Sequence, residues 1–90
     1  MDINYVEIFK ALSDESRLKI VKSLIKNESQ CACKLLELVS CGQPTLSHHM
    51  TILIKCGLIN SKKVGKWVHY SINNDVMLQI IKYLGEENEL

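Results

Sequence analysis

Apolar residues recur every three to four positions through much of the chain, and this spacing predicts helices. The predicted helices cover about residues 3–12, 14–26, 32–39, 44–56 and 74–84. Between the last two helices the spacing changes to every second residue, which predicts two strands over 59–64 and 66–72. Gly65 marks the turn between these strands, and residues 86–90 are expected to form a frayed tail. The chain is therefore predicted to be mainly α-helical, with a small β-hairpin before its last helix.

Each of these elements has one apolar side available for packing. In the first helix this side carries Ile3, Val6, Phe9 and Leu12, in the second it carries Leu18, Val21, Leu24 and Ile25, and in the last it carries Val76, Met77, Ile80, Ile81 and Leu84. In the second strand, one face carries Val68, Tyr70 and Ile72 and the other carries Trp67, His69 and Ser71.

Residues that commonly begin or end helices support these boundaries. Ser13-Asp14 can cap the second helix, Pro44 suits the first position of the fourth, and Gly57 suits the residue after its end. Two short helices joined by a tight turn at Cys41–Gln43, followed by a hairpin, indicate a winged helix-turn-helix. We expect residues 1–90 to form one such domain with five helices and a two-stranded wing. A chain this short leaves much surface exposed, so a partner subunit would add stability.

The fourth predicted helix has two chemically different sides when its residues are placed about 100° apart. Leu46, Met50 and Leu53 cluster on one side, with His49 at its flank. The opposite side carries Pro44, Ser47, His48, Thr51 and Lys55 and no acidic residue. Such a side can approach the major groove of DNA, where hydroxyl and imidazole groups reach base edges or phosphates. An ordinary amphipathic surface helix would also have a polar outer side.

The net charge of +1 hides a local basic region. Residues 38–74 contain four lysines, all three histidines and no acidic residue. Lys62, Lys63 and Lys66 surround the predicted turn, where they can reach DNA phosphates or only protect a strand edge. A region of this kind suits a polyanion such as DNA, with a solvated surface loop as the alternative.

The chain starts without a basic and apolar leader, and no apolar run approaches the ~20 residues of a membrane span. We therefore expect a cytoplasmic protein with no membrane partner. Its four cysteines then indicate metal binding, redox chemistry or core packing rather than a disulfide framework. Cys31 and Cys33 lie two residues apart, and thiolates select soft ions. On a regular helix their side chains would point about 200° apart, so a shared ion requires a distorted helix start.

Four segments together make the sequence recognisable. They are Phe9–Ile20 (FKALSDESRLKI), Gln43–Met50 (QPTLSHHM), Gly57–Ile59 (GLI) and Gly65–Ile72 (GKWVHYSI). They resemble the ArsR/SmtB family of metal-responsive winged-helix repressors, and the last segment is very close to arsenical-resistance operon repressors. The resemblance covers about residues 6–84, and the four segments are specific together where each alone is weak.

The resemblance implies a homodimer that binds double-stranded operator DNA. Dimer contacts would come from about residues 3–12 and 74–84, and the fourth helix and the wing would read the DNA. From the helix face, the wing and the family positions together, the residues expected to contact DNA are Gln43, Pro44, Thr45, Ser47, His48, Thr51, Lys55, Lys62, Lys63 and Lys66. His49 is expected to pack against the core instead.

The pair Cys31-Ala32-Cys33 resembles the Cys-Val-Cys-Asp-Leu motif of the family's third helix, where As(III) or another soft metal ion acts as inducer. Lys34 replaces the usual acid, and Glu37 replaces a third cysteine that arsenical repressors often carry. The third ligand stays open, with Cys41 as a candidate only if the helix ends early or bends. The identity of the inducer stays open among arsenite, antimonite, cadmium, zinc, a redox signal and no inducer at all. Cys56 is expected to be a buried core thiol.

The leading hypothesis is a repressor that releases its operator when a soft metal or metalloid binds the thiols. A second hypothesis keeps the fold and makes Cys31 and Cys33 a redox or reactive-sulfur switch. A third is an interaction dimer without a role in DNA binding, suggested by the low net charge and the apolar last helix. An enzyme, or an obligatory cofactor, is not expected, because the sequence has no glycine-rich phosphate loop and no recognisable catalytic constellation.

Overall fold

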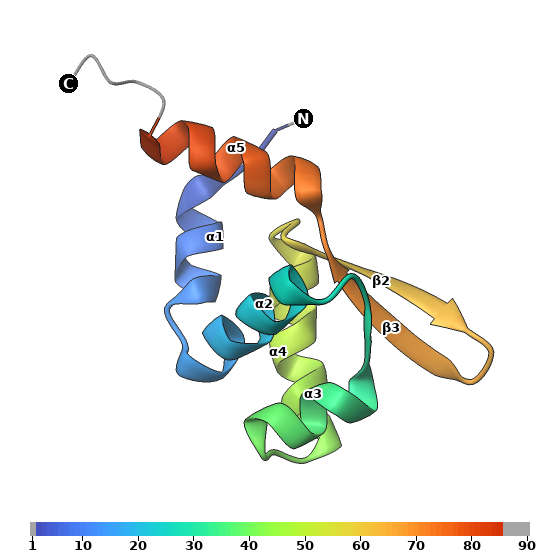
Figure 1. Cartoon of the computed structure of the whole chain (residues 1–90). Coiled ribbons are helices and arrows are strands. Elements are labelled where there is room, and N and C mark those ends of the chain that lie inside the picture. The colour runs from blue at the N-terminus through green and yellow to red at the C-terminus, as the bar shows by residue number, and fades with distance from the viewer. Residues whose placement is uncertain (1, 86–90) are drawn as a thin grey trace.

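The computed structural model describes residues 2–85 and contains every helix and strand that the sequence predicts. In chain order the elements are α1 (Tyr5–Leu12), α2 (Glu15–Lys26), β1 (Gln30–Cys31), α3 (Ala32–Val39), α4 (Gln43–Lys55), β2 (Ile59–Val64), β3 (Trp67–Ile72) and α5 (Asn74–Gly85) (Figure 1). The expected tail over 86–90 lies outside the described residues. Among the described helices, none is long and apolar enough to cross a membrane.

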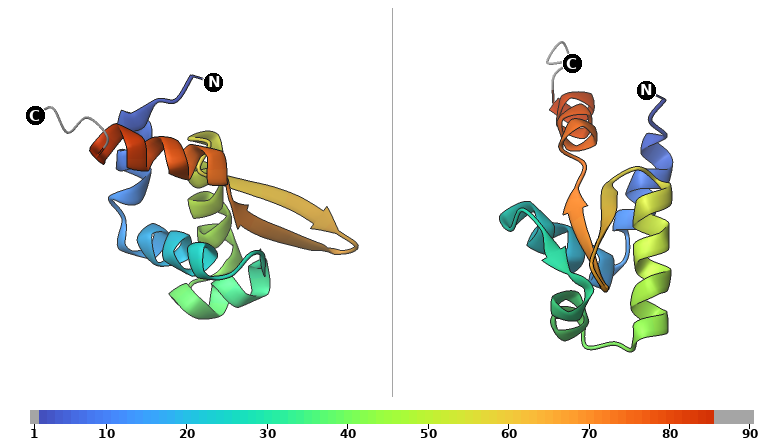
Figure 2. Two further views of the ribbon diagram at one scale, coloured as in Figure 1. Left: turned by 45° about the horizontal axis from the view of Figure 1, so that its top comes forward. Right: turned by 90° about the vertical axis from the view of Figure 1, so that its right-hand side faces the viewer.

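The helices form a bundle from which the β2–β3 hairpin projects (Figure 1). Helix α5 lies at one end of the molecule next to α1, and the turn between α3 and α4 lies at the other end (Figure 2). The helix-turn-helix and the wing are therefore separated from the terminal helices. The predicted class, a mainly helical winged helix-turn-helix, is confirmed.

The β2–β3 hairpin is the predicted two-stranded wing, and the short strand β1, which the sequence did not predict, adds a third strand to the sheet. Strand order is β1-β3-β2, and both pairings are antiparallel. Gln30 lies opposite Tyr70 and Cys31 lies opposite His69. Strand β1 has only two residues, too few to show an alternating pattern, so its pairing depends on tertiary contacts that the sequence pattern does not encode.

The wing turn consists of Gly65 and Lys66, because Val64 pairs directly with Trp67. Gly65 has φ of +63°, whereas Lys66 is not among the described residues with positive φ. Positive φ at the first central residue only is the pattern of a type II′ turn, whose twist matches the right-handed twist of the strands. The second strand therefore begins at Trp67, one residue later than predicted.

Local sequence signals explain the helix ends. The Asp14 carboxylate accepts a hydrogen bond of 3.0 Å from the amide of Arg17, which confirms the predicted cap of α2. Helix α4 begins at Gln43, so Pro44 occupies its second position, where an amide hydrogen is not needed. Gly57 follows α4 with φ of +88°, a left-handed conformation that favours glycine.

The core takes buried side chains from all five described helices and from β2 and β3. Its buried side chains are Ile8, Ala11, Ile20, Val21, Leu24, Leu35, Leu46, Met50, Leu53, Leu58, Ile59, Ile72, Val76 and Ile80. Each large aliphatic side chain in this set contributes roughly 1.5–3 kcal/mol by leaving water.

Two of the predicted apolar stripes are rotated relative to the buried faces. Helix α2 buries Ile20, whereas Leu18 and Ile25 are 45% and 55% exposed. Helix α1 buries Ile8 and Ala11, whereas Val6 and Phe9 are 63% and 37% exposed. Apolar spacing alone could not choose between these faces, because the choice depends on which neighbour each helix meets.

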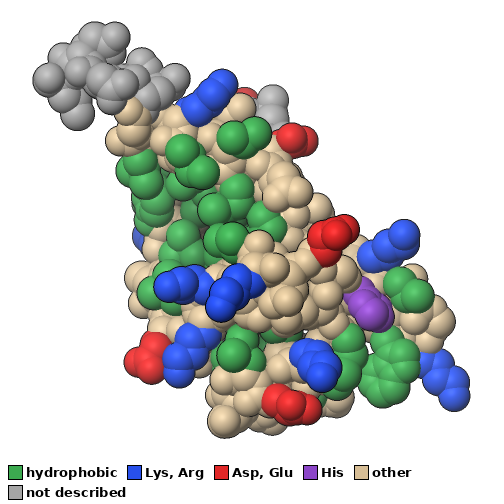
Figure 3. Space-filling model, in the orientation of Figure 1, with side chains coloured by type: hydrophobic (Ala, Val, Ile, Leu, Met, Phe, Trp, Pro, Cys, Tyr) green, Lys and Arg blue, Asp and Glu red, His purple; other side chains and the backbone are tan. Residues whose placement is uncertain are grey.

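Helices α1 and α5 together carry an apolar surface within the single subunit. The exposed members of this surface, called the terminal-helix surface below, are Val6, Phe9, Leu78, Ile81 and Leu84. Hydrophobic side chains also gather in the space-filling view over the part of the molecule that α1 and α5 occupy (Figure 3).

Candidate nucleic-acid interface and thiol site

Helix α4 presents the polar side predicted for it to solvent. Its exposed side chains include all seven of the predicted DNA contacts on this helix: Gln43, Pro44, Thr45, Ser47, His48, Thr51 and Lys55. Leu46, Met50 and Leu53 are at most 3% exposed and pack into the core. The exposed side is free of acidic groups, as an approach to phosphates requires.

The wing adds three cationic side chains. Lys62, Lys63 and Lys66 are all exposed, and within residues 2–85 none of the three forms a salt bridge. Lys62 lies opposite His69 and Lys63 opposite Val68, so the two β2 lysines project from opposite faces of the hairpin. The hairpin therefore carries positive charge on both faces and at its tip.

His49 holds α4 against the start of α2. Its Nδ1 lies 3.0 Å from Nη1 of Arg17 and 3.9 Å from Oδ2 of Asp14. Because a guanidinium can only donate, Nδ1 accepts this hydrogen bond and the imidazole hydrogen sits on Nε2. The Nε of Arg17 also donates to the carbonyl of Ala11 at 2.7 Å, which ties α1 to the same cluster.

Asp14 belongs to this cluster, and the hydrogen bond from the Arg17 amide holds the pKa of its carboxyl below its ordinary value. The positive charge of Arg17 acts in the same direction, while partial burial opposes it. The side chain of His49 is only 12% exposed, in agreement with the expected packing role. Its polar partners were not foreseen, since Arg17 lies 32 residues away along the chain.

The two closely spaced cysteines meet at the junction of β1 and α3. Cys31 ends β1 and caps α3 in an extended conformation, with φ of −72° and ψ of 151°. Its Sγ accepts a hydrogen bond of 3.2 Å from the amide of Cys33. The Cα atoms are 5.4 Å apart and the sulfurs are joined in a disulfide. Because Cys31 precedes the helix, the sulfurs converge without the helix distortion expected from the sequence.

This arrangement suits a soft ion, because two thiolates released by reduction would face the same point. The structure does not bring Cys41 to the pair. Cys41 lies beyond the far end of α3, half-buried, with a free thiol. Within residues 2–85, no three His, Cys, Asp or Glu side chains are placed to hold one metal ion.

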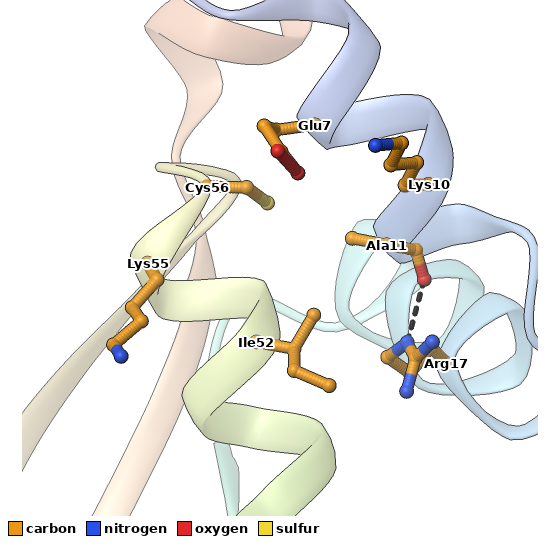
Figure 4. A pocket seen from close by; sticks show the side chains of 7 residues that line it. All are labelled: Glu7, Lys10, Ala11, Arg17, Ile52, Lys55 and Cys56. Atoms are coloured by element: carbon orange, nitrogen blue, oxygen red, sulfur yellow. Dashed lines mark hydrogen bonds between the residues drawn. The ribbon is translucent and has the colours of Figure 1, made fainter.

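Cys56 is a separate, half-buried thiol at the end of α4. Its Sγ donates to the carbonyl of Leu53 at 3.3 Å, and burial raises the pKa of the thiol. It borders a hollow of about 460 Å³ between α1, α2 and α4, which Glu7, Arg17 and Ile52 also line (Figure 4). Cys56 packs against the core but is only half-buried, which corrects the expected buried core thiol, and it is separate from Cys31 and Cys33.

A second hollow lies between Cys33 and the predicted DNA-contacting elements. It has a volume of about 280 Å³ and lies between α3, α4 and the wing. Cys33 lines it together with Ser47 of α4 and Trp67 of β3. Cys33 thus shares a groove with both the predicted recognition helix and the wing.

The fold and this surface define a winged helix-turn-helix protein of the DNA-binding regulator class. Residues 14–61, more than half of the chain, match the family model described as bacterial regulatory protein, arsR family. The chain belongs to this family, and it is accordingly a DNA-binding transcriptional regulator and not an enzyme.

Similar proteins carry related names. An uncharacterized HTH-type transcriptional regulator of Methanocaldococcus jannaschii is 45% identical over 80 residues, covering 89% of this chain and 90% of that protein. The arsenical resistance operon repressor of Escherichia coli is 36% identical over 81 residues, covering 90% and 69%. The cadmium resistance transcriptional regulatory protein CadC of Listeria innocua is 40% identical over 74 residues, covering 82% of this chain but only 62% of its own length.

The fold is matched by solved structures as well. An ArsR family transcriptional regulator superposes with a TM-score of 0.81 at 22% identity, covering 94% of this chain and 87% of that one. At this identity the likeness establishes the fold alone.

Proposed function

We propose that this regulator is a homodimeric repressor that releases its operator when an arsenite-type metalloid or a soft metal binds Cys31 and Cys33. The observation that carries the proposal is the convergence of the two sulfurs where β1 meets α3. The names of its relatives agree with it, because one is an arsenical and another a cadmium resistance regulator.

Dimerisation is supported by the terminal-helix surface. Five large apolar side chains on α1 and α5 are between 37% and 64% exposed in the single subunit, which is unusual for a monomer when they are contiguous. A two-fold interface through these helices would bury them against the same residues of a second copy. It would also present two α4 helices to the two halves of an inverted-repeat operator.

DNA binding through α4 and the wing is supported by charge and exposure. The acid-free side of α4 carries Ser47 and His48 outward, and the wing adds Lys62, Lys63 and Lys66. Hydroxyl and imidazole groups can reach base edges, whereas the lysines suit flanking phosphates.

The route from ligand to DNA release follows the connections of the thiol pair. Cys31 is paired to β3 of the wing, and Cys33 lies in the first turn of α3, which packs against α4. A ligand drawing these sulfurs into a new position would move both DNA-contacting elements relative to each other. A 100-fold loss of operator affinity requires about 2.7 kcal/mol of difference in ligand binding between the two states.

The test is operator binding by the reduced protein with and without arsenite or cadmium. We expect the wild type to release a fluorescent operator fragment when arsenite or cadmium is added. A Cys31→Ser, Cys33→Ser variant should bind the fragment and stay bound to it after the same addition. Cys56→Ser is the matched control and should release normally. Release by a Cys41→Ser variant tests whether Cys41 is a third ligand of the metal or metalloid. Release from the double-serine variant by arsenite would refute the site.

A second candidate function is a thiol redox switch, because Cys31 and Cys33 are bonded to each other in the structure. Oxidation of the two thiols to the disulfide by a peroxide would then replace ligand binding as the signal, with the peroxide reduced to water and alcohol. Mass spectrometry of peroxide-treated protein tests it. DNA release without a bridged or modified Cys31 or Cys33 would eliminate this function.

A further inference from the structure

A histidine from the wing lies beside the thiol pair. His69 of β3 is directly opposite Cys31 of β1 in the antiparallel ladder. Residues opposite each other in such a ladder project from the same face, with Cβ atoms roughly 4.5–5.5 Å apart. Cys33 is bonded to Cys31, so both sulfurs lie next to the strand that carries His69.

The imidazole of His69 has no other assignment in the structure. It is half-buried, and within the described part of the chain it has no hydrogen-bond or ion-pair partner. It projects from the face of β3 opposite to Val68 and Tyr70, which line the groove next to α3 and α4. The ring is therefore free to turn toward Cys31.

We propose that His69 is the third protein ligand of this site, which makes it a two-sulfur, one-nitrogen site for a borderline-soft divalent cation. The inference rests on the proposed function of the thiol pair and specifies divalent cations as the class of ion that the site binds. Thiolate and neutral imidazole are the donors that divalent zinc, cadmium and cobalt share, whereas As(III) is satisfied by sulfur. Sequence analysis left the third ligand open because His69 is 38 residues from Cys31 and only strand pairing brings them together.

The site forms only in the reduced protein. With Cys31 and Cys33 bonded, residues 2–85 hold no three-ligand group. A phosphine reductant opens the disulfide, giving two thiols while the phosphine takes up the oxygen of water. Binding of the cation then releases the two thiol protons to solvent.

Such a site would join the thiols directly to the wing. On its other side, His69 lies opposite Lys62 of β2, a predicted phosphate contact. A cation held by His69 thus lies one strand away from a lysine of the DNA-binding surface. A divalent cation bound by His69 would therefore contact the wing directly, whereas a ligand held by the sulfurs alone would act on the wing only through β1.

Cobalt(II) titration of the reduced protein, without DNA, tests the ligand set. Thiolate-to-cobalt charge-transfer bands report the sulfurs, and visible ligand-field bands report the full set. Trp67, the single tryptophan, lies on the same face of β3 as His69 and gives an independent affinity by quenching. We expect His69→Gln to weaken cobalt binding at least ~10-fold and shift the ligand-field bands, since loss of even an outer-shell partner costs 10–100-fold. Ser71→Ala, on the same face of the strand, is the control and should bind as the wild type does.

The outcomes separate this inference from the proposed function. If His69→Gln binds cobalt with wild-type affinity and spectrum, the inference fails while the thiol site stands. If the double-serine variant keeps the charge-transfer bands, the proposed site itself fails. Arsenite binding should survive in His69→Gln, and its loss would show that His69 only supports the fold. Zinc titration of the wild type followed by NMR of the imidazole nitrogens needs no variant, and unchanged His69 resonances at saturation would also overturn the inference.

Discussion

At the scale of residues, two adjacent histidines of α4 have opposite environments. His48 is exposed on the side predicted to face DNA, whereas His49 turns inward to Arg17 and Asp14. The helix periodicity separates them by about 100°, which is enough to give one a contact role and the other a structural role.

Replacement of these two histidines should therefore affect different properties. His49→Ala removes the acceptor of Arg17 and should lower the free energy of unfolding by about 1–3 kcal/mol, because a part-buried donor loses its partner. His48→Ala should change stability by less than about 0.5 kcal/mol, as expected at an exposed site, and weaken operator binding. Urea unfolding and fluorescence anisotropy measure the two effects. Equal loss of stability in both variants would contradict the assignment.

Asp14 makes part of the free energy of unfolding depend on pH. Its pKa is lowered from 3.8, chiefly by the hydrogen bond from the Arg17 amide. A carboxyl with a lower pKa in the folded chain stabilises the fold above its unfolded pKa, and this contribution is lost as the pH falls through the folded pKa. Asp14→Asn keeps a capping acceptor without the charge. We expect its Tm to lie below that of the wild type at neutral pH and to converge with it as the pH falls below 3.8. A difference that stays constant down to about pH 2 would argue against this role.

At the scale of elements, β3 organises the functional half of the molecule. It pairs with β2 to form the wing and with β1 to bring the thiol pair to the sheet. The type II′ turn at Gly65 places Lys66 at the tip of the projecting hairpin (Figure 1). A lysine at this position contributes charge rather than packing, so its role is visible in the salt dependence of binding.

Replacement of Lys66 at the wing tip should change the salt dependence of DNA binding. If Lys66 neutralises one phosphate, Lys66→Ala lowers the slope of log affinity against log salt by about 0.9. Lys82→Ala, on α5, removes an equal charge away from the wing and should leave the slope unchanged. Anisotropy titrations of an operator fragment at several salt concentrations measure both variants. Identical slopes for Lys66→Ala and wild type would exclude the wing tip as a phosphate contact.

At the scale of the whole molecule, the two proposed interaction surfaces lie at opposite ends. The α3–α4 turn and the wing carry the predicted DNA surface, and α1 and α5 carry the terminal-helix surface at the opposite end (Figure 2). A dimer through the terminal helices would leave both DNA surfaces free.

Glutamate in the terminal-helix surface should separate the subunits. Ile81 is 60% exposed in the subunit, so Ile81→Glu leaves the single-chain fold intact but buries a charge in the proposed dimer. Two such buried charges per dimer weaken association at least ~100-fold, because each costs several kcal/mol. Leu38→Glu is the matched control, since Leu38 is 41% exposed on α3, at the end of the molecule opposite to this surface (Figure 2). Sedimentation equilibrium distinguishes the two, and an Ile81→Glu protein that stays dimeric would refute the interface.

Much of the fold, and the exposed acid-free side of α4, could be predicted from local sequence. The two sides of α4 follow from helical spacing, so Leu46 and Met50 are buried and Ser47 is exposed as expected. The Asp14 cap and the turn at Gly65 follow from the conformations those residues favour. In α2, spacing alone favoured Leu18 over Ile20 as a core residue, and packing against the neighbouring elements decided otherwise.

The sequence by itself determined the order of elements, the outward side of α4 and the presence of two neighbouring thiols, because these depend on periods and preferences within a few residues. Only the tertiary structure decided that Gln30–Cys31 join the sheet, that Cys31 is extended, and that His69 stands opposite it. The reason is that strand pairing joins residues distant along the chain through backbone hydrogen bonds, which every residue except proline can donate and which leave no pattern in a two-residue strand.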